Sequence, residues 1–144
     1  MGNSFCHVEL MTEDDKKAVE FYKKMFAWKF KKLSVDEETD YYVLDTGKEP
    51  GGGIMKLPAP DAPNTWNVYI QVADVAAHVK KAKKLGATVD VGKTEIPGFG
   101  WFAILTDPQG AVFGIWQPPE PPAKRKPKKA KKTTGKNESR PFQR

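Results

Sequence analysis

The chain has 144 residues, of which 39% are hydrophobic and 11% aromatic, enough for one domain with an apolar core. No apolar run approaches the roughly 20 residues that a membrane-spanning helix needs, and Cys6 is the only cysteine, which excludes an internal disulfide. The net charge of +6 is uneven: residues 120–144 hold 10 basic and 2 acidic side chains, whereas residues 1–119 hold 14 and 16. These features predict a cytoplasmic protein, and overall charge predicts no basic face on residues 1–119.

The first half of the chain is predicted to form a strand, a helix and three strands. Alternation indicates a strand at 5–10, and Thr12 is a suitable N-cap for the following helix. The apolar face of that helix has helical spacing and comprises Ala18, Phe21, Tyr22, Met25 and Phe26. Short strands are expected at 28–33, 41–45 and 53–57, with a glycine-rich turn at 47–52 before the last one.

The second half repeats this order. A strand is expected at 66–72, then a helix capped by Asp74 and stopped at Gly86, then strands at 88–91, 101–106 and 112–117. A type I turn is expected at 107–110, where the sequence reads Asp-Pro-Gln-Gly. A shift of 60 residues places Asp14 on Asp74 and Leu10 on Ile70, and chance similarity of two amphipathic helices is the less economical explanation.

These elements predict an α+β fold of two tandem βαβββ modules, at about 1–59 and 60–119, with curled mixed sheets. Residues 120–144 form a separate basic segment in which proline and lysine dominate. Between Ala123 and Gln143 its only large apolar residue is Phe142, so burial cannot offset its ordering entropy and we expect a disordered tail.

Strand alternation separates an apolar face from a mixed one. The apolar face should pack on the helices. The opposite face combines polar with aromatic side chains, as a ligand-binding cleft requires: His7, Glu9, Asn67, Tyr69, Gln71 and Trp116.

Three segments resemble one known superfamily. Residues 21–28 read FYKKMFAW, similar to a family stretch F-Y-x-x-x-F-G-W, and residues 107–117 read DPQGAVFGIWQ, similar to its ending D-P-x-G-x-x-F-G-L-W. Residues 94–102, TEIPGFGWF, look like a loop of its uncharacterised bacterial branch. Over about residues 5–117, the chain resembles the vicinal oxygen chelate (VOC) superfamily, which includes glyoxalase I, bleomycin-resistance proteins and extradiol dioxygenases. The resemblance implies a glyoxalase-like fold around a shared cleft.

The metal enzymes of that superfamily hold their ion with residues on the first and last strands of each module. The resemblance carries these positions to His7, Gly53 (or Met55, with one gap), Asn67 and Gly114. His7 is the only strong ligand among them, and Glu9 adds at most a second, whereas a catalytic site usually needs about three. We therefore expect no cofactor and no catalytic metal, with a divalent metal as the alternative.

The candidate ligand-binding residues are His7, Glu9, Met55, Asn67, Tyr69, Gln71, Trp101 and Trp116. For each, a plainer interpretation stays open. His7 is either a general base or a hydrogen-bonded cleft histidine; Glu9 either binds a basic ligand or is an exposed carboxylate. The aromatic rings either stack on a planar ligand or pack in the core. No catalytic residue is assigned.

Three functions follow from these features. The first is a small-molecule-binding protein of the glyoxalase or bleomycin-resistance type without a catalytic metal. The second is a metal-dependent lyase or dioxygenase of the same superfamily. The third is a nucleic-acid-associated ligand sensor, in which residues 123–144 contact a polyanion nonspecifically. A homodimer is a further expectation, because the superfamily often pairs or swaps modules between chains.

Overall fold

The computed structural model describes residues 2–34, 37–57 and 59–120. It confirms the strand–helix–three-strand order twice over. The first module contains β1 (Phe5–Thr12), α1 (Asp15–Met25), β2 (Lys29–Ser34), β3 (Asp40–Asp45) and β4 (Gly51–Lys56). The second contains β5 (Thr65–Gln71), α2 (Val75–Lys84), β6 (Thr88–Ile96), β7 (Gly100–Thr106) and β8 (Val112–Gln117).

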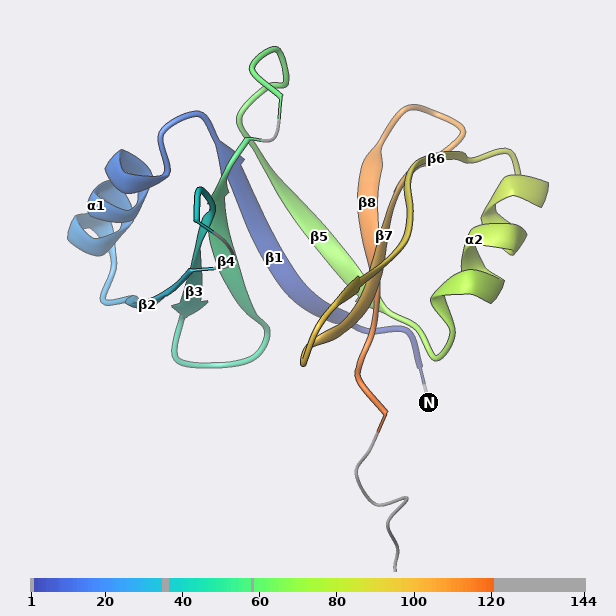
Figure 1. Ribbon diagram of the computed structural model, residues 1–144, viewed down its shortest axis with the longest axis horizontal. Helices are drawn as coiled ribbons and strands as arrows, with labels where there is room; N and C mark the ends of the chain where they lie inside the picture. Colours follow the sequence, from blue (N-terminus) through green and yellow to red (C-terminus); the bar gives the residue numbers. More distant parts are fainter. Residues whose placement is uncertain (1, 35–36, 58, 121–144) are drawn as a thin grey trace, which may run out of the picture.

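All eight strands join one mixed, open sheet in the order β2-β3-β4-β1-β5-β8-β7-β6. β1 and β5 lie side by side at its centre, with α1 and α2 at opposite ends of the molecule (Figure 1). In each module the first strand pairs in parallel with the last, and the two modules meet through antiparallel pairing of β1 with β5. The chain therefore has the α+β fold expected from its internal repeat.

The strand register shows that individual residues of the two modules occupy corresponding positions. Glu9 lies opposite Gly53 across β1 and β4, and Tyr69 lies opposite Gly114 across β5 and β8. Glu9 and Tyr69 are 60 residues apart, which is the shift found in the sequence. The two modules thus place equivalent glycines beside equivalent positions of the two central strands.

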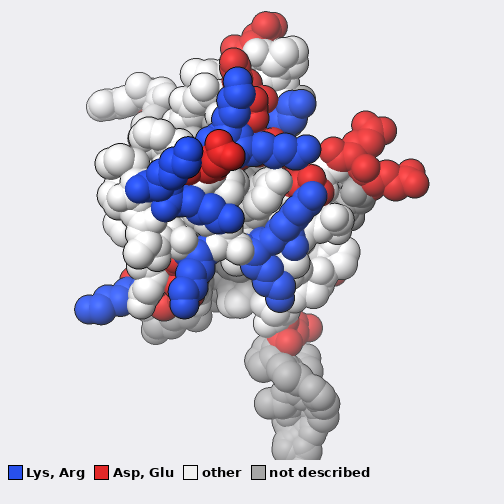
Figure 2. All heavy atoms as spheres, turned by 90° about the vertical axis from the view of Figure 1, so that its left-hand side faces the viewer, with Lys and Arg blue, Asp and Glu red and all other residues white. Residues whose placement is uncertain are grey.

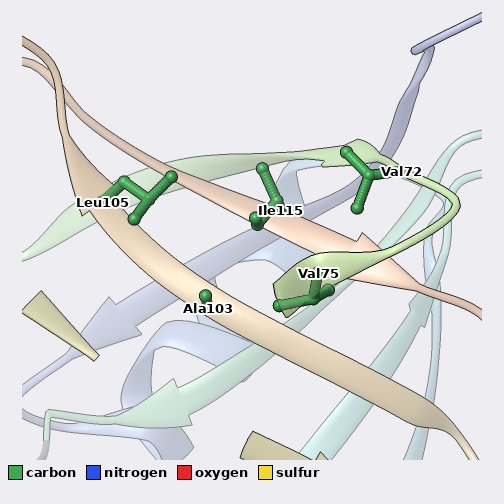
Figure 3. Packing of buried hydrophobic residues seen from close by; sticks show 5 residues of the cluster. All are labelled: Val72, Val75, Ala103, Leu105 and Ile115. Atoms are coloured by element: carbon green, nitrogen blue, oxygen red, sulfur yellow. The ribbon is translucent and has the colours of Figure 1, made fainter. Parts of the chain in front are cut away.

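Each helix packs on its own half of the sheet. Under α2, the buried side chains are Val72, Val75, Ala103, Leu105 and Ile115, all at most 4% exposed (Figure 3). Under α1, the buried cluster is smaller and consists of Leu10, Val19 and Ile54. Because alternate residues of a strand face opposite sides, this packing turns His7 and Glu9 away from the helices.

Several predicted boundaries were wrong, and α1 shows why. Its N-cap is Asp14, whose side chain accepts a hydrogen bond from the Lys17 backbone at 3.0 Å, and not Thr12. Thr12 instead continues β1, where it pairs with Lys56. β4 begins at Gly51, two residues before the predicted start, and β6 continues to Ile96, five residues beyond the predicted end. Pairing with a neighbouring strand can hold residues in a sheet even where their sequence lacks a strand-like pattern.

The caps and turn predicted in the second module are confirmed. Asp74 accepts from the Ala77 backbone at 3.1 Å, and Gly86 follows the helix with φ of +96°, a conformation that favours glycine. At 107–110, the Gly110 backbone donates to the Asp107 carbonyl at 3.0 Å, which confirms a turn, and the Asp107 carboxylate accepts from the backbones of Gln109 and Ala111.

The predicted basic tail lies almost wholly outside the described residues, which end at Glu120. Within the part that the structure describes, no helix combines the length and apolarity needed to cross a bilayer.

Candidate functional site

The mixed face of the two central strands carries a connected group of polar side chains. Glu9 lies at its centre, only 6% exposed. One of its carboxylate oxygens accepts a hydrogen bond from the Tyr41 hydroxyl at 2.9 Å, and the other accepts from the Tyr69 hydroxyl at 3.0 Å. β1 supplies the carboxylate, whereas β3 and β5 supply the two donors, so both modules build the group.

Burial raises the pKa of Glu9, because desolvation disfavours its charged form, while the two tyrosine hydroxyls act in the opposite direction. Burial and the neighbouring carboxylate raise the pKa of both tyrosines. The hydroxyls of Tyr41 and Tyr69 are therefore protonated at neutral pH and act as donors to Glu9.

His7 joins this group through Tyr41, whose hydroxyl oxygen is 2.7 Å from Nε2. When Glu9 is ionised, the single hydroxyl proton of Tyr41 is donated to Glu9, and His7 Nε2 then donates to the Tyr41 oxygen. Burial lowers the pKa of His7, which favours the neutral ring. Among the described residues, none hydrogen-bonds to Nδ1, so the neutral ring keeps an acceptor there. This contact agrees with the plainer interpretation of His7 as a hydrogen-bonded histidine. Its partner, Tyr41, was not expected from the sequence.

Asn67 lies directly across from Glu9 in the β1–β5 register and is 9% exposed. Within the described part of the chain, its side-chain amide has no hydrogen-bond partner. A buried amide without a partner costs about 1–3 kcal/mol, so a native structure that retains one calls for an explanation. Among the described residues, Asn67 thus lies beside the hydrogen-bonded group with two unused donors and an unused acceptor.

The remaining predicted residues divide between the two faces. Trp116 stands beside His7 and Tyr69, with ring centroids 6.4 Å from each. Gln71 pairs with Trp116 in the β5–β8 register, and Met55 pairs with Tyr41 in β3. Trp101 lies apart from this group, because it packs against the buried cluster under α2.

The two glycines explain how the tyrosines fit. A Cβ atom built on Gly53 would overlap the hydroxyl and ring of Tyr41, and one built on Gly114 would overlap the ring of Tyr69. Each tyrosine thus occupies the space into which any larger residue at the glycine would project. Sequence reasoning missed Tyr41, since the alternation in 41–45 gave no sign that its ring crosses over β4.

The same observation tests the fit of a catalytic metal. The resemblance assigns one metal-ligand position to Gly114 and another to Gly53, or to Met55 with one gap, and the side-chain space of both glycines is filled by rings. Among residues 2–34, 37–57 and 59–120, no three His, Cys, Asp or Glu side chains gather as a metal-binding group. The residues present therefore do not fit the metal centre of the superfamily.

Comparison with known proteins agrees with this architecture. A family model described as "Glyoxalase-like domain" matches residues 7–116. The Mycobacterium bovis protein named "Putative glyoxylase CFP32" is 36% identical over 110 residues, which are 76% of this chain and 42% of that protein. This chain thus spans less than half the length of that relative. The anthracycline biosynthesis protein DnrV of Streptomyces peucetius is 33% identical over 68 residues, covering 47% of this chain and 23% of that protein.

Solved structures show the same fold at low sequence identity. The hypothetical protein BH1468 of Bacillus halodurans has a TM-score of 0.65 and 13% identity, covering 84% of this chain and 98% of that chain. Methylmalonyl-CoA epimerase of Mycobacterium tuberculosis has a TM-score of 0.62 and 13% identity, covering 81% of this chain and 89% of that chain. The chain belongs to the glyoxalase-like domain family of the vicinal oxygen chelate superfamily.

Proposed function

We propose that this protein binds a small organic molecule at the mixed face of β1 and β5, without a catalytic metal. One observation carries the proposal. Gly53 and Gly114 have no side chain, and the rings of Tyr41 and Tyr69 fill the space beside them. The hydroxyls of both tyrosines donate hydrogen bonds to Glu9. A hydrogen-bonded group of side chains on the strands to which the resemblance assigns metal ligands supports binding without a metal.

The chemistry of the group suggests how a ligand would be oriented. The unpartnered amide of Asn67 offers both donors and an acceptor, and the neutral His7 ring offers an acceptor at Nδ1. Trp116 supplies an aromatic surface next to His7. A ligand with a planar apolar part and a polar group that both donates and accepts hydrogen bonds would complement these three residues.

Ligand-detected NMR with a library of soluble metabolites tests this binding. We expect compounds that show a binding effect with the native protein, lose it with Asn67→Ala and keep it with His78→Ala. His78→Ala is the control, because it also removes a polar side chain, but on α2. Thermal melts establish that both variants are folded. Hits that bind both variants equally would contradict the assigned face.

The alternative, a metal-dependent lyase or dioxygenase, predicts a different result. Calorimetric titration with Zn²⁺, Ni²⁺, Mn²⁺ and anaerobic Fe²⁺ should detect no stoichiometric site that EDTA reverses. A site with one ion per chain that is lost in His7→Ala would overturn the metal-independent proposal.

A further inference from the structure

A second feature lies on the α1 side of the molecule, away from the group around Glu9. The segment from Lys16 to Lys32 holds seven lysines and one acidic residue, Glu20, although residues 1–119 as a whole are slightly acidic. All seven lysines are exposed, and only Lys32 forms an ion pair with another described residue, Asp40. Figure 2 shows Lys and Arg side chains spread over the middle of this end, which we call the lysine end, with Asp and Glu side chains among them and along its upper and right-hand edges.

Five aromatic rings form a continuous cluster beside these lysines. They belong to Phe21, Tyr22, Phe26, Trp28 and Trp66. Tyr22 and Phe26 both stack on Trp28, at 5.7 and 4.8 Å between ring centroids, and Tyr22 meets Trp66 at 5.4 Å. Phe21 is 56% exposed, Phe26 44% and Trp66 36%, so the cluster is open to solvent in part. Packing on the sheet explains the buried surface of these rings, but it does not explain their solvent-exposed surface.

Two rings of the cluster also line a hollow. A pocket of about 240 Å³ is lined by Trp28 and Trp66, whose rings meet edge to face, and by Val8 and Gly52 of the sheet. Sites for drug-sized ligands usually occupy about 300–1,000 Å³, so this pocket suits a single ring system. Val8 and Gly52 alternate with His7, Glu9 and Gly53 along their strands, which places the pocket on the opposite face from the polar group.

The charge of this surface limits what could cover it. Pairing the same surface of two copies would bring two sets of lysines together, which electrostatic repulsion opposes. The exposed rings of Phe21 and Phe26 could also meet an anionic membrane, but a membrane surface does not account for the recess that Trp28 and Trp66 line. A single-stranded nucleic acid alternates phosphates with flat bases, and proteins that bind it combine cationic side chains with aromatic rings on which bases stack.

We propose that the lysine end and its aromatic cluster bind single-stranded nucleic acid, with one base entering the recess that Trp28 and Trp66 line. The lysines of α1 and β2 contact phosphates, and the exposed rings stack on neighbouring bases. This site is independent of small-molecule binding on the other face. It also differs from nonspecific attraction by the basic residues 123–144, because it requires unpaired bases.

Fluorescence anisotropy with the full chain and a labelled oligodeoxythymidylate of about 12 nucleotides tests the lysines. We expect Lys23→Ala/Lys24→Ala to weaken binding and to reduce the slope of log Kd against log salt by about 1–2. The control is Lys83→Ala/Lys84→Ala, which changes the equivalent lysines of α2 at the other end of the molecule and leaves the tail intact. Equal losses in the two double variants would attribute binding to overall charge and overturn the proposal.

A second pair of variants tests the rings. Phe21→Ala should weaken binding of the oligonucleotide about fivefold or more, as expected for loss of a stacking surface, while Phe99→Ala should not. Phe99 is the matched control, because it is a phenylalanine with similar exposure, 53%, in another part of the chain. The oligonucleotide should also quench tryptophan fluorescence, and a duplex of the same length should not.

Three results would overturn the proposal. The first is unchanged binding in Phe21→Ala, and the second is equal quenching by single strand and duplex. The third is binding to phosphatidylserine vesicles that depends on Lys23 and Phe21 when oligonucleotide binding does not, which would assign this surface to a membrane. Thermal melts of each variant exclude unfolding as the cause of any loss.

Discussion

The N-terminal and C-terminal modules have the same order of elements, yet their helices cover the sheet to different extents. Each helix buries one residue, Val19 in α1 and Val75 in α2, but the buried cluster that includes Val75 has five members and the one that includes Val19 has three. On α1, Phe21 and Met25 remain 56% exposed. The comparison indicates that the C-terminal module contributes more to stability, while the N-terminal module presents more surface for interaction.

The polar group shows the same division. Its carboxylate, its histidine and one of its two tyrosines come from the N-terminal module, and Tyr69 comes from the C-terminal module. At equivalent positions of the repeat, one module places Glu9 and the other Tyr69. An internal repeat has thus diverged into an acceptor and a donor that bind each other across the interface of the modules.

The largest effect should come from the two cores. Leu105→Ala, at a position 1% exposed, should lower the free energy of unfolding by about 2–5 kcal/mol, because it leaves a cavity in the larger core. Ile54→Ala should cost less within that range, since fewer buried neighbours surround it. Urea denaturation measures both, with the half-exposed Val112→Ala as control. Equal losses for Ile54 and Leu105 would contradict the difference between the modules.

A smaller effect should distinguish the two tyrosines. Tyr41→Phe should destabilise the protein by about 1–3 kcal/mol, because Glu9 loses a donor and His7 Nε2 loses its acceptor. Tyr69→Phe removes only a donor to Glu9. Nitrogen-15 NMR of the imidazole should therefore report a changed His7 ring in Tyr41→Phe and an unchanged ring in Tyr69→Phe. Identical spectra in both variants would exclude the proposed link through Tyr41.

The helix caps should show no difference between the modules. Asp14→Ala and Asp74→Ala should each cost about 1 kcal/mol, because each removes one hydrogen bond to the third residue of its helix at a similar length. Asp61→Ala, in the exposed connection between the modules, serves as control. A much larger cost at Asp74 would mean that its cap also supports the larger core.

The smallest effect is a gradient with pH. Because burial raises the folded pKa of Glu9, its protonated form is favoured in the folded state, and this contribution is lost as pH rises through that pKa. Relative to Glu9→Gln, the native protein should therefore lose stability as pH rises above the ordinary carboxyl pKa of about 4.3. His7 has the opposite sign, since its lowered pKa costs stability as pH falls below about 6.5, but it is present in both proteins and cancels. Parallel stability profiles would contradict the raised pKa.

The sequence by itself determined the order of elements and their pairing into two modules, because amphipathic spacing, aspartate caps and a 60-residue repeat are local signals. It also indicated that His7, Glu9, Asn67 and Tyr69 share a face, since strand alternation has a period of two. The tertiary structure decided what those residues contact. Tyr41 reaches Glu9 only because β3 packs beside β4 and Gly53 leaves room for its ring, and no spacing along the chain encodes that contact. The density of lysines in residues 16–32 is a local feature of the sequence, but the fold places them at one end of the molecule beside Trp66, which completes the aromatic cluster.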